Sequence, residues 1–481
     1  MASFYIENFG CRVTQADGAA LETQFLERGL QRATTARDAQ IVVLNTCTVT
    51  DGADKDARAS IRRLQRDNPG CRILVTGCYA QRAPQELAEI PGVTWVVGNS
   101  HKHLAAEIAT ASPSAAFVPL SQLAPAAEKV IVGDIFAHTE LLAAPVFDSA
   151  NERTRPNLKV QDGCDNRCSF CVIPFVRGQS RSLPLERILS EVRSLVGAGY
   201  REVVISGINL GRWGRDLEGA SQAVLSARGP RLEELIRAIL EETELEKLRI
   251  SSVEPMDWSD ALIELMAGSS RIAKHAHVPL QSASDTVLRR MHRKYRPWHY
   301  REKIEKIHAA MPNAAIGADV MAGFPGETER EFEETRRMVQ ELPLTYLHVF
   351  TYSARPGTPA ATRHDQVPVR VARERNRVLR ELAAEKKARF LSAQVGQRLR
   401  AITLQAGDGE FTEALSDNYL KMKIRGTLPA NRWVDVHVEG KVGESLIAQS
   451  DLRPERGQHS EVTLSNTHKS NNLIDLQPLA G

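Results

Sequence analysis

Three cysteines, Cys164, Cys168 and Cys171, stand close together in the segment QDGCDNRCSFCVIPFVRG. Their CxxxCxxC spacing puts three thiolates on one loop, enough for three irons of a 4Fe-4S cluster and one ligand short of a structural zinc site. The fourth iron is then open to S-adenosylmethionine (SAM), whose sulfonium an electron from the cluster can cleave to give a carbon radical. We therefore expect a SAM-binding cluster here. The alternative is a zinc knuckle completed by a distant His or Cys.

A second set of cysteines, Cys11, Cys47 and Cys78, follows three strand-like segments, FYIENFGC, IVVLNTC and RILVTGC. If these strands are parallel, the three thiols meet at the carboxyl edge of one sheet, where open α/β sheets bind ligands. This arrangement predicts a second 4Fe-4S cluster with one open iron. The alternative is three buried apolar thiols, which are common for free cysteine. Cys71 precedes its strand, about 20 Å away at the opposite edge, and we expect it to be a bystander.

The elements that must position these thiols alternate between strand and helix. Helical patterns at residues 16–28 and 53–67 separate the first three strands, which predicts a parallel sheet with right-handed crossovers. The alternation returns over residues 155–360, which predicts a full or partial barrel of βα units. Its helix carries the apolar residues Leu185, Ile188, Val192 and Leu195, and its strands are EVVIS, KLRIS, HAHVPL, AIGADVMAGF and LHVFTY.

The C-terminal part of the chain has a different pattern. Residues 370–389 form a basic helix with eight Lys or Arg against three Glu, and residues 395–449 read as short strands between turns. The predicted fold is therefore α/β, with a parallel-sheet N-terminal domain, a partial barrel and a small C-terminal β-barrel. The expected boundaries are 1–112 for the first domain, 113–152 for a linker, 153–390 for the barrel, 391–454 for the β-barrel and 455–481 for a tail.

Composition excludes several classes of protein. The net charge is only +3, from 62 basic and 59 acidic residues, so any nucleic-acid-binding face must be local. The 7 cysteines lie between residues 11 and 171, which argues against a disulfide framework. No apolar run approaches the roughly 18 residues of a membrane span, and the start MASFYIENFGC is no secretory signal. We expect a cytoplasmic protein with no membrane partner.

Several motifs together resemble the methylthiotransferases. They are ENFGCRVTQ, NTCTVTDGADKDAR, VTGCYAQ, the CxxxCxxC loop with IPFVRG, SGINLGRWG, HVPLQSASDTVLRRMHRKY and MAGFPGETEREFEET, over about residues 3 to 360. The β-rich C-terminal segment looks like the RNA-binding TRAM domain that accompanies them. The resemblance implies a radical SAM barrel and an enzyme that replaces an unreactive C–H with C–SCH3, consuming two SAM molecules per product. It implies that the cluster on Cys11, Cys47 and Cys78 handles sulfur and that the cluster on Cys164, Cys168 and Cys171 cleaves SAM.

The family splits by substrate. NTCTVT and QDGC look like the branch that acts at C2 of threonylcarbamoyladenosine beside the tRNA anticodon. Thr14, where that branch commonly has Asn, and the long stretch at residues 219–230 depart from its pattern. The alternatives within the family are isopentenyladenosine in tRNA and an aspartate of a ribosomal protein. The non-enzymatic alternative is a zinc-binding RNA adaptor. The implied partners are tRNA, a flavodoxin- or ferredoxin-type electron donor and a sulfur source.

Secondary sites follow from strand ends and basic segments. SAM contacts are expected from Gly207, Asn209, Gln281, Ser282, Asp319 and Gly323, although turn geometry alone accounts equally well for the glycines. Arg177 and Arg181 either pair with a carboxylate or phosphate or lie in solvent. In residues 289–303, basic side chains can contact RNA phosphates while Tyr295, Trp298 and Tyr300 stack on bases. The alternative is that this segment is the solvated face of an amphipathic helix. The expected RNA contacts are Arg289, Arg290, Arg293, Lys294, Arg296, Lys421, Lys423 and Arg425.

Overall fold

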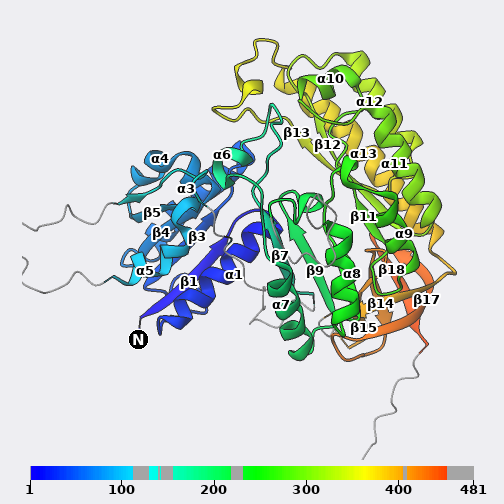
Figure 1. Ribbon diagram of the computed structural model, residues 1–481, viewed down its shortest axis with the longest axis horizontal. Helices are drawn as coiled ribbons and strands as arrows, with labels where there is room; N and C mark the ends of the chain where they lie inside the picture. The colour runs from blue at the N-terminus through cyan, green and yellow to red at the C-terminus, as the bar shows by residue number, and fades with distance from the viewer. Residues whose placement is uncertain are drawn as a thin grey trace, which may run out of the picture.

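The computed structural model describes residues 2–111, 129–138, 141, 155–217, 231–404 and 409–451. The stretch at residues 219–230 and the tail from residue 455 lie outside the described residues. The N-terminal sheet lies at one end of the molecule, the α/β barrel occupies the middle, and the small β-barrel packs beneath the barrel at the other end (Figure 1). No helix of the described chain is long and apolar enough to cross a membrane.

The N-terminal domain contains a parallel sheet of six strands in the order β2-β1-β3-β4-β5-β6. Its strands are β1 (Ser3–Asn8), β2 (Gln31–Arg32), β3 (Ile41–Thr46), β4 (Arg72–Gly77), β5 (Val93–Gly98) and β6 (Val130–Ile131). Its helices are α1 (Arg12–Glu27), α2 (Asp51–Asp67), α3 (Cys78–Arg82), α4 (Pro84–Ala88), the 3-10 helix η1 (Asn99–Leu104) and α5 (Ala105–Thr110). The predicted parallel sheet is confirmed.

Local sequence explains where these elements begin. Every residue of β3 is buried, because helices cover both faces of the central strands, as a parallel sheet requires. α2 begins earlier than its apolar pattern indicated because the Thr50 side chain accepts a hydrogen bond from the Ala53 N–H and caps the helix. β6 comes from the segment expected to be a linker and pairs with β5, so this segment contributes a strand to the sheet.

The central domain is a partial barrel. One sheet has the order β10-β9-β7-β8 and another has the order β11-β12-β13, and single bridges such as Ser252 to His277 join them. The strands are β7 (Asn157–Asp162), β8 (Arg181–Ser182), β9 (Glu202–Gly207), β10 (Lys247–Ile250), β11 (His275–His277), β12 (Ala315–Ala322) and β13 (Tyr346–Thr351). All five expected strands are present. β7, which leads into the CxxxCxxC loop, was not expected from the sequence.

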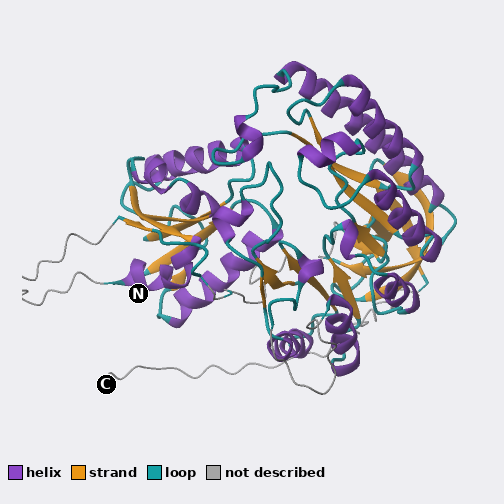
Figure 2. Ribbon diagram, turned by 45° about the horizontal axis from the view of Figure 1, so that its top comes forward, coloured by secondary structure: helices purple, strands orange, loops and turns teal. Residues whose placement is uncertain are grey.

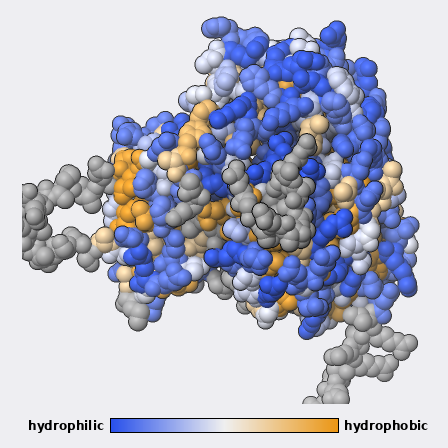
Figure 3. Space-filling view, in the orientation of Figure 1, coloured by the Kyte–Doolittle hydropathy of each residue, from blue (hydrophilic) through white to orange (hydrophobic). Residues whose placement is uncertain are grey.

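Helices cover the outside of this barrel, as Figure 2 shows. They are α6 (Ile173–Arg177), α7 (Leu185–Gly197), η3 (Leu210–Arg212), α8 (Leu232–Glu242), η4 (Pro255–Asp257), α9 (Asp260–Gly268), α10 (Asp285–Arg290), α11 (Pro297–Ala310), α12 (Glu329–Glu341), η5 (Pro359–Thr362) and α13 (Val369–Ala393). The predicted apolar face of α7 is buried at Ile188, Val192 and Leu195. Hydrophilic side chains dominate the surface over the outer helices (Figure 3).

The small C-terminal barrel is closed, in the order β14-β15-β16-β18-β17. Its strands are β14 (Arg398–Thr403), β15 (Phe411–Ser416), β16 (Lys421–Arg425), β17 (Trp433–Val442) and β18 (Ser445–Ser450). The β15–β16 turn meets the amino ends of the α/β barrel strands, where Arg249 donates to the Asp417 carbonyl at 3.1 Å and Lys247 pairs with the Asp417 carboxylate at 3.2 Å. The small barrel therefore closes the amino end of the α/β barrel, and the predicted small C-terminal β-barrel is confirmed.

Candidate metal and cofactor centre

The N-terminal cysteines lie at one edge of the parallel sheet. Cys11 immediately precedes α1, Cys47 follows β3, and Cys78 is the first residue of α3, directly after β4. Burial, together with the neighbouring Cys78 and Cys11 thiolates, raises the pKa of Cys47 to about 12. Gly10 has a φ of +107°, and a Cβ there would lie 2.7 Å from the Cys47 Cβ, so glycine is needed for this approach. Cys71 precedes β4 at the opposite edge.

The other three cysteines, Cys164, Cys168 and Cys171, occupy the loop between β7 and α6. Within this loop the Cys171 N–H donates to the Cys168 carbonyl, and the Cys164 N–H donates to the Gly178 carbonyl, both at 3.1 Å. Burial, together with the Cys168 and Cys164 thiolates, raises the pKa of Cys171 to about 12. Such thiols release their protons when a metal binds, because the cation stabilises the thiolate.

Each set of thiols receives N–H donors from nearby side chains. Hydrogen bonds to ligand sulfurs are one means by which proteins adjust an iron-sulfur cluster. The donors are Asn99 Nδ2 to Cys78 Sγ at 3.6 Å, Asn209 Nδ2 to Cys164 Sγ at 3.6 Å and Arg293 Nη1 to Cys168 Sγ at 3.3 Å. The surroundings of both sets suit sulfur that carries negative charge.

The spacing of the thiols distinguishes a cluster from a single zinc ion. Among the described residues, the group whose ligand atoms all lie within 4.8 Å of one another is His277, Asp319 and His348, and neither cysteine set reaches that spacing. Tetrahedral zinc with Zn–S bonds of about 2.3 Å would hold its sulfurs within about 4 Å of one another. A cubane keeps them further apart because each thiolate binds a different iron. Neither cysteine set is therefore arranged as a single tetrahedral zinc ion would hold it.

A buried ion cluster joins the two domains beside these sites. Asp17 of α1 accepts hydrogen bonds from Lys102 at 2.9 Å and from Arg177 at 3.0 Å, and it also pairs with Lys159. Arg177 binds both oxygens of Asp162 at 3.0 Å. All five side chains are buried. Of the two expectations for Arg177, the structure shows the paired one.

The same contacts link the two cysteine sets through α6. Val176 and Val172 pack against Cys78, and Asn99 donates to the Val176 carbonyl at 2.7 Å. Burial alone would lower the pKa of Arg177, but Asp162, the Cys78 thiolate and Asp17 raise it well above its usual value. α6, which begins two residues after Cys171, thus has the Cys78 site packed against it.

Comparison with known proteins places this geometry in a family. Residues 158–339 match the model of the radical SAM superfamily, and residues 3–98 match the uncharacterized protein family UPF0004. The chain is 36% identical to the threonylcarbamoyladenosine tRNA methylthiotransferase MtaB of Aquifex aeolicus and 37% identical to that of Bacillus subtilis, covering 89% of this chain and 98% and 91% of the relatives. The chain belongs to the radical SAM methylthiotransferase family.

Two further comparisons set the limits of the likeness. The chain is 34% identical to a tRNA-2-methylthio-N(6)-dimethylallyladenosine synthase of Sphingopyxis alaskensis, over 85% of this chain and 88% of that protein. Among solved structures, the radical SAM methyltransferase TsrM of Kitasatospora setae superposes with a TM-score of 0.52 at 14% identity, covering 75% of this chain and 77% of that one. The latter match shows a shared fold.

In this methylthiotransferase, Gln161 orients a residue expected to contact SAM. Its Oε1 accepts from the Asn209 N–H at 2.7 Å, and its Nε2 donates to the Ser180 hydroxyl at 2.9 Å. The Asn209 side chain thereby faces Cys164, and its Oδ1 is buried without a hydrogen-bond partner. A Cβ on Gly207 would lie 2.8 Å from Gln161 Oε1, so this glycine accommodates Gln161. Sequence reasoning missed Gln161, which only its place in QDGC could have indicated.

The remaining expected SAM residues lie in different environments. Gln281 has a φ of +63° and forms a bridge with Val320, whereas the Ser282 side chain is fully buried with its Oγ 3.2 Å from Thr335 Oγ1. Gly323 has a φ of +77°, and a Cβ there would collide with Ala372 of α13. The structure therefore gives Ser282 and Gly323 packing roles.

Asp319 lies among polar side chains on three neighbouring strands. Its Oδ1 is 3.1 Å from His277 Nε2 and 3.2 Å from His348 Nδ1. Burial alone would raise the pKa of Asp319, but hydrogen bonds from His277 and His348 hold it well below its usual value. The carboxylate is therefore ionised at neutral pH.

The basic segment at residues 289–303 differs from the expected RNA-binding face. Tyr295 and Tyr300 are buried, and their hydroxyls donate to backbone carbonyls, so they cannot stack on bases. Trp298 is 57% exposed. Arg293 is also buried, against Cys168 and Glu254, so it faces the cysteine loop and not RNA. The tyrosine stacking prediction was wrong because these apolar faces pack into the barrel core.

The other expected RNA contacts divide into paired and open cations. Arg290 donates to the Gly326 carbonyl and pairs with Glu331, which ties it to the fold. Lys294 is exposed, whereas Arg289 and Arg296 both pair with Asp285. On β16 the basic side chains alternate with buried Met422 and Ile424 and face solvent together. They are Lys421, Lys423 and Arg425, of which Arg425 pairs with Glu439 at 2.9 Å.

The second arginine after the cysteine loop, Arg181, donates to the His138 carbonyl at 3.1 Å. Within the described part of the chain, its partner is therefore a backbone carbonyl. Thr14, the departure from the branch pattern, is buried, and its Oγ1 lies 3.6 Å from Cys11 Sγ. A hydroxyl at this position can hydrogen-bond to the thiol.

Proposed function

We propose that the protein methylthiolates C2 of threonylcarbamoyladenosine beside the anticodon of tRNA. The observation that carries this proposal is the pair of three-thiol sites, packed against one another through α6, in a chain that is 36% identical to MtaB of Aquifex aeolicus over nearly its whole length. Two sites with one open iron each suit a reaction that needs both a radical and a sulfur donor.

The proposed ligands are the six cysteines of the two sets. Cys164, Cys168 and Cys171 would hold the SAM-binding cluster, and Cys11, Cys47 and Cys78 the cluster that handles sulfur. When bound, the two clusters supply the electron that cleaves SAM and the sulfur that reaches the substrate. A reductant of the flavodoxin or ferredoxin type and an external sulfur source belong to the proposal.

The chain's own residues hold these groups in place. Asn209, oriented by Gln161, offers an unpartnered buried carbonyl oxygen at the edge of the cysteine loop, suited to an ammonium or hydroxyl group of SAM. Gln281 and Asp319 on neighbouring segments face the barrel interior from its other side. Arg293 donates to Cys168 and places a positive charge beside that site.

RNA recognition is assigned to the exposed basic row of β16 and to Lys294. Alternation along a strand puts Lys421, Lys423 and Arg425 on one solvent-facing side, where they can neutralise phosphates. Because tRNA is the proposed substrate, we place the enzyme in the cytoplasm.

The test is an anaerobic assay with reconstituted protein, SAM, sulfide and dithionite. Three substrates are compared: tRNA with threonylcarbamoyladenosine, tRNA with isopentenyladenosine, and the ribosomal protein, with nucleosides and peptides analysed by mass spectrometry. We expect product only from the first. Methylthiolation of the second or third alone would overturn the substrate assignment, and two zinc ions without iron would support the zinc-binding RNA adaptor.

A further inference from the structure

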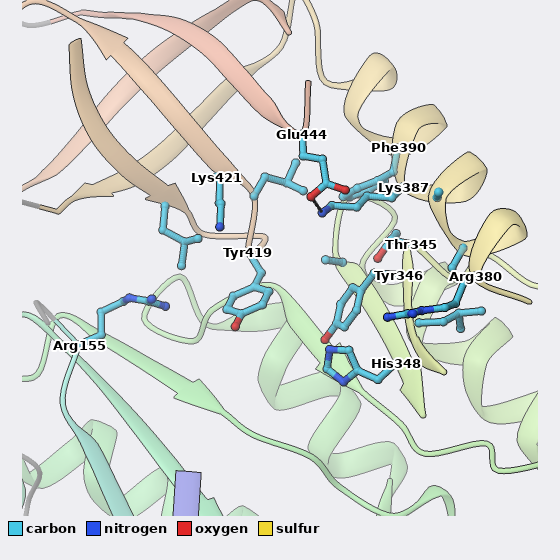
Figure 4. Close-up of a pocket in the computed structure, with 16 residues that line it drawn as sticks. Arg155, Thr345, Tyr346, His348, Arg380, Lys387, Phe390, Tyr419, Lys421 and Glu444 are labelled. Atoms are coloured by element: carbon cyan, nitrogen blue, oxygen red, sulfur yellow. Dashed lines mark hydrogen bonds and ion pairs between the residues drawn. The ribbon is translucent and has the colours of Figure 1, made fainter. Parts of the chain in front are cut away.

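A cavity of about 420 Å³ lies where the edge of the α/β barrel meets α13 and the small barrel. Its wall includes the start of β13, the inner face of α13 and the β15–β16 turn of the small barrel (Figure 4). Tyr346 and Tyr419 stand side by side in its middle, with ring centroids 6.3 Å apart. The cavity thus adjoins the amino end of the barrel interior, on the open side between β13 and β7.

The cavity is rich in positive charge. Arg155 and Arg380 approach it from opposite sides, and Lys421 points into it from the small barrel (Figure 4). Its one carboxylate among the described lining residues is Glu444, which is paired with Lys387 at 2.7 Å. Arg155 has a buried Nη1 without a hydrogen-bond partner, and its Nη1 is 3.9 Å from Glu202. This balance favours an anionic ligand.

His348 connects this cavity to the polar wall of the barrel. It lines the cavity, and its Nδ1 lies 3.2 Å from Asp319 Oδ1, which in turn is 3.1 Å from His277 Nε2. Tyr346, which also lines the cavity, shares its hydroxyl with His277 Nδ1 at 3.0 Å. A continuous polar row therefore runs from the cavity along β13, β12 and β11.

The length of this row matches a particular substituent. His348 lies three residues before the carboxyl end of β13, about 10 Å along the strand from that end, whereas Arg155 lies seven residues before the carboxyl end of β7, about 23 Å from it. In threonylcarbamoyladenosine, seven bonds separate C2 from the carboxylate carbon of the threonyl group, about 8 Å when extended. A base whose C2 faces the carboxyl end of the barrel can therefore place that carboxylate at the cavity.

We infer that this cavity binds the threonyl carboxylate of the substrate, with Arg380 as its cationic partner and His348 and Asp319 along the carbamoyl group. The inference rests on the proposed function and names the part of the enzyme that selects the substrate. A dimethylallyl group has no charge, so it could not pair with Arg380 and would bind less tightly.

The test compares binding of two forms of the same tRNA, with and without the threonylcarbamoyl group, to reconstituted enzyme. We expect the wild type to bind the modified form roughly tenfold more tightly, and R380Q and H348L to lose most of this difference. Arg380 is exposed and has no ion pair among the described residues, so R380Q should not disturb folding. R389Q, on the same helix but outside the cavity, is the matched control and should keep the difference.

The outcomes separate this inference from the proposed function. If the wild type methylthiolates the modified tRNA but R380Q and H348L keep the full discrimination, the cavity does not bind the carboxylate. If R380Q weakens both tRNA forms equally and lowers the salt dependence of binding, the cavity holds an RNA phosphate and the inference is overturned. If the wild type does not act on threonylcarbamoyladenosine at all, the proposed function itself fails.

Discussion

The substitution D17N tests whether the buried ion cluster holds the N-terminal domain to the barrel. Asp17 is the carboxylate that α1 contributes, and its partners Lys159 and Arg177 belong to the barrel. Burial alone would raise the pKa of Asp17, but Lys102, Lys159 and Arg177 lower it far more, so the native state depends on the ionised form. D17N would leave three buried cations facing Asp162 alone.

The expected loss is large because the remaining charges cannot reach water. Breaking a buried charge network by removing one partner costs about 3–5 kcal/mol, whereas an exposed pair contributes at most about 1 kcal/mol. The matched control is E107Q, which removes the exposed Arg28–Glu107 pair on the same domain. We expect D17N to lower the free energy of unfolding in urea several-fold more than E107Q does, with early proteolysis between the two domains.

The deficit should also depend on pH in a defined direction. Burial already lowers the pKa of Lys102, and Asp17 opposes that effect. In D17N the folded-state pKa of Lys102 falls further. At any pH below the usual lysine pKa, the unfolded chain then binds more protons than the folded chain does. The stability of the folded state therefore rises with pH. We expect the D17N deficit to shrink between pH 7 and pH 9. A deficit below about 1 kcal/mol, or one that grows with pH, would refute this reasoning.

Three further predictions follow from the structure. C71S should leave iron and acid-labile sulfide unchanged, because Cys71 lies at the sheet edge opposite the other thiols; loss of about half the iron would contradict this. Burial lowers the pKa of His275 well below its usual value, so unfolded histidine binds more protons below about pH 6.5 and stability falls with acid, by about 1.4 kcal/mol per pH unit. Urea titration at pH 6.5 and 5.5 should show this slope in wild type and a smaller one in H275Q; equal slopes would disprove it. R293Q should make the SAM-site cluster harder to reduce, because a positive charge beside Cys168 is lost; an unchanged potential in a redox titration would count against that role.

The architecture could be predicted because its signals are local. The strands before Cys11, Cys47 and Cys78 are short apolar runs that alternate with helices, and that pattern is sufficient for a parallel sheet. β7 was missed because Lys159, Gln161 and Asp162 interrupt its apolar pattern. All three are buried, and Lys159 and Asp162 pair with Asp17 and Arg177 from other parts of the fold.

The ion cluster and the cavity could not be predicted because their members are distant in the sequence. Arg177 and Asp17 are separated by 160 residues, and a single sequence gives no sign that two such charges are neighbours. The same holds for Arg155 and Arg380, which line one cavity only because α13 and the small barrel pack against the open side of the α/β barrel. Conversely, Tyr295 and Tyr300 looked like an RNA-binding motif until packing placed them in the core.

Iron and acid-labile sulfide per chain, measured after anaerobic reconstitution, test the central claim that two clusters lie on either side of α6. The account predicts about eight irons in the wild type and about four in each of two triple variants, one with Cys11, Cys47 and Cys78 replaced by alanine and the other with Cys164, Cys168 and Cys171 replaced. A wild type with about four irons, or with zinc and no labile sulfide, would contradict it.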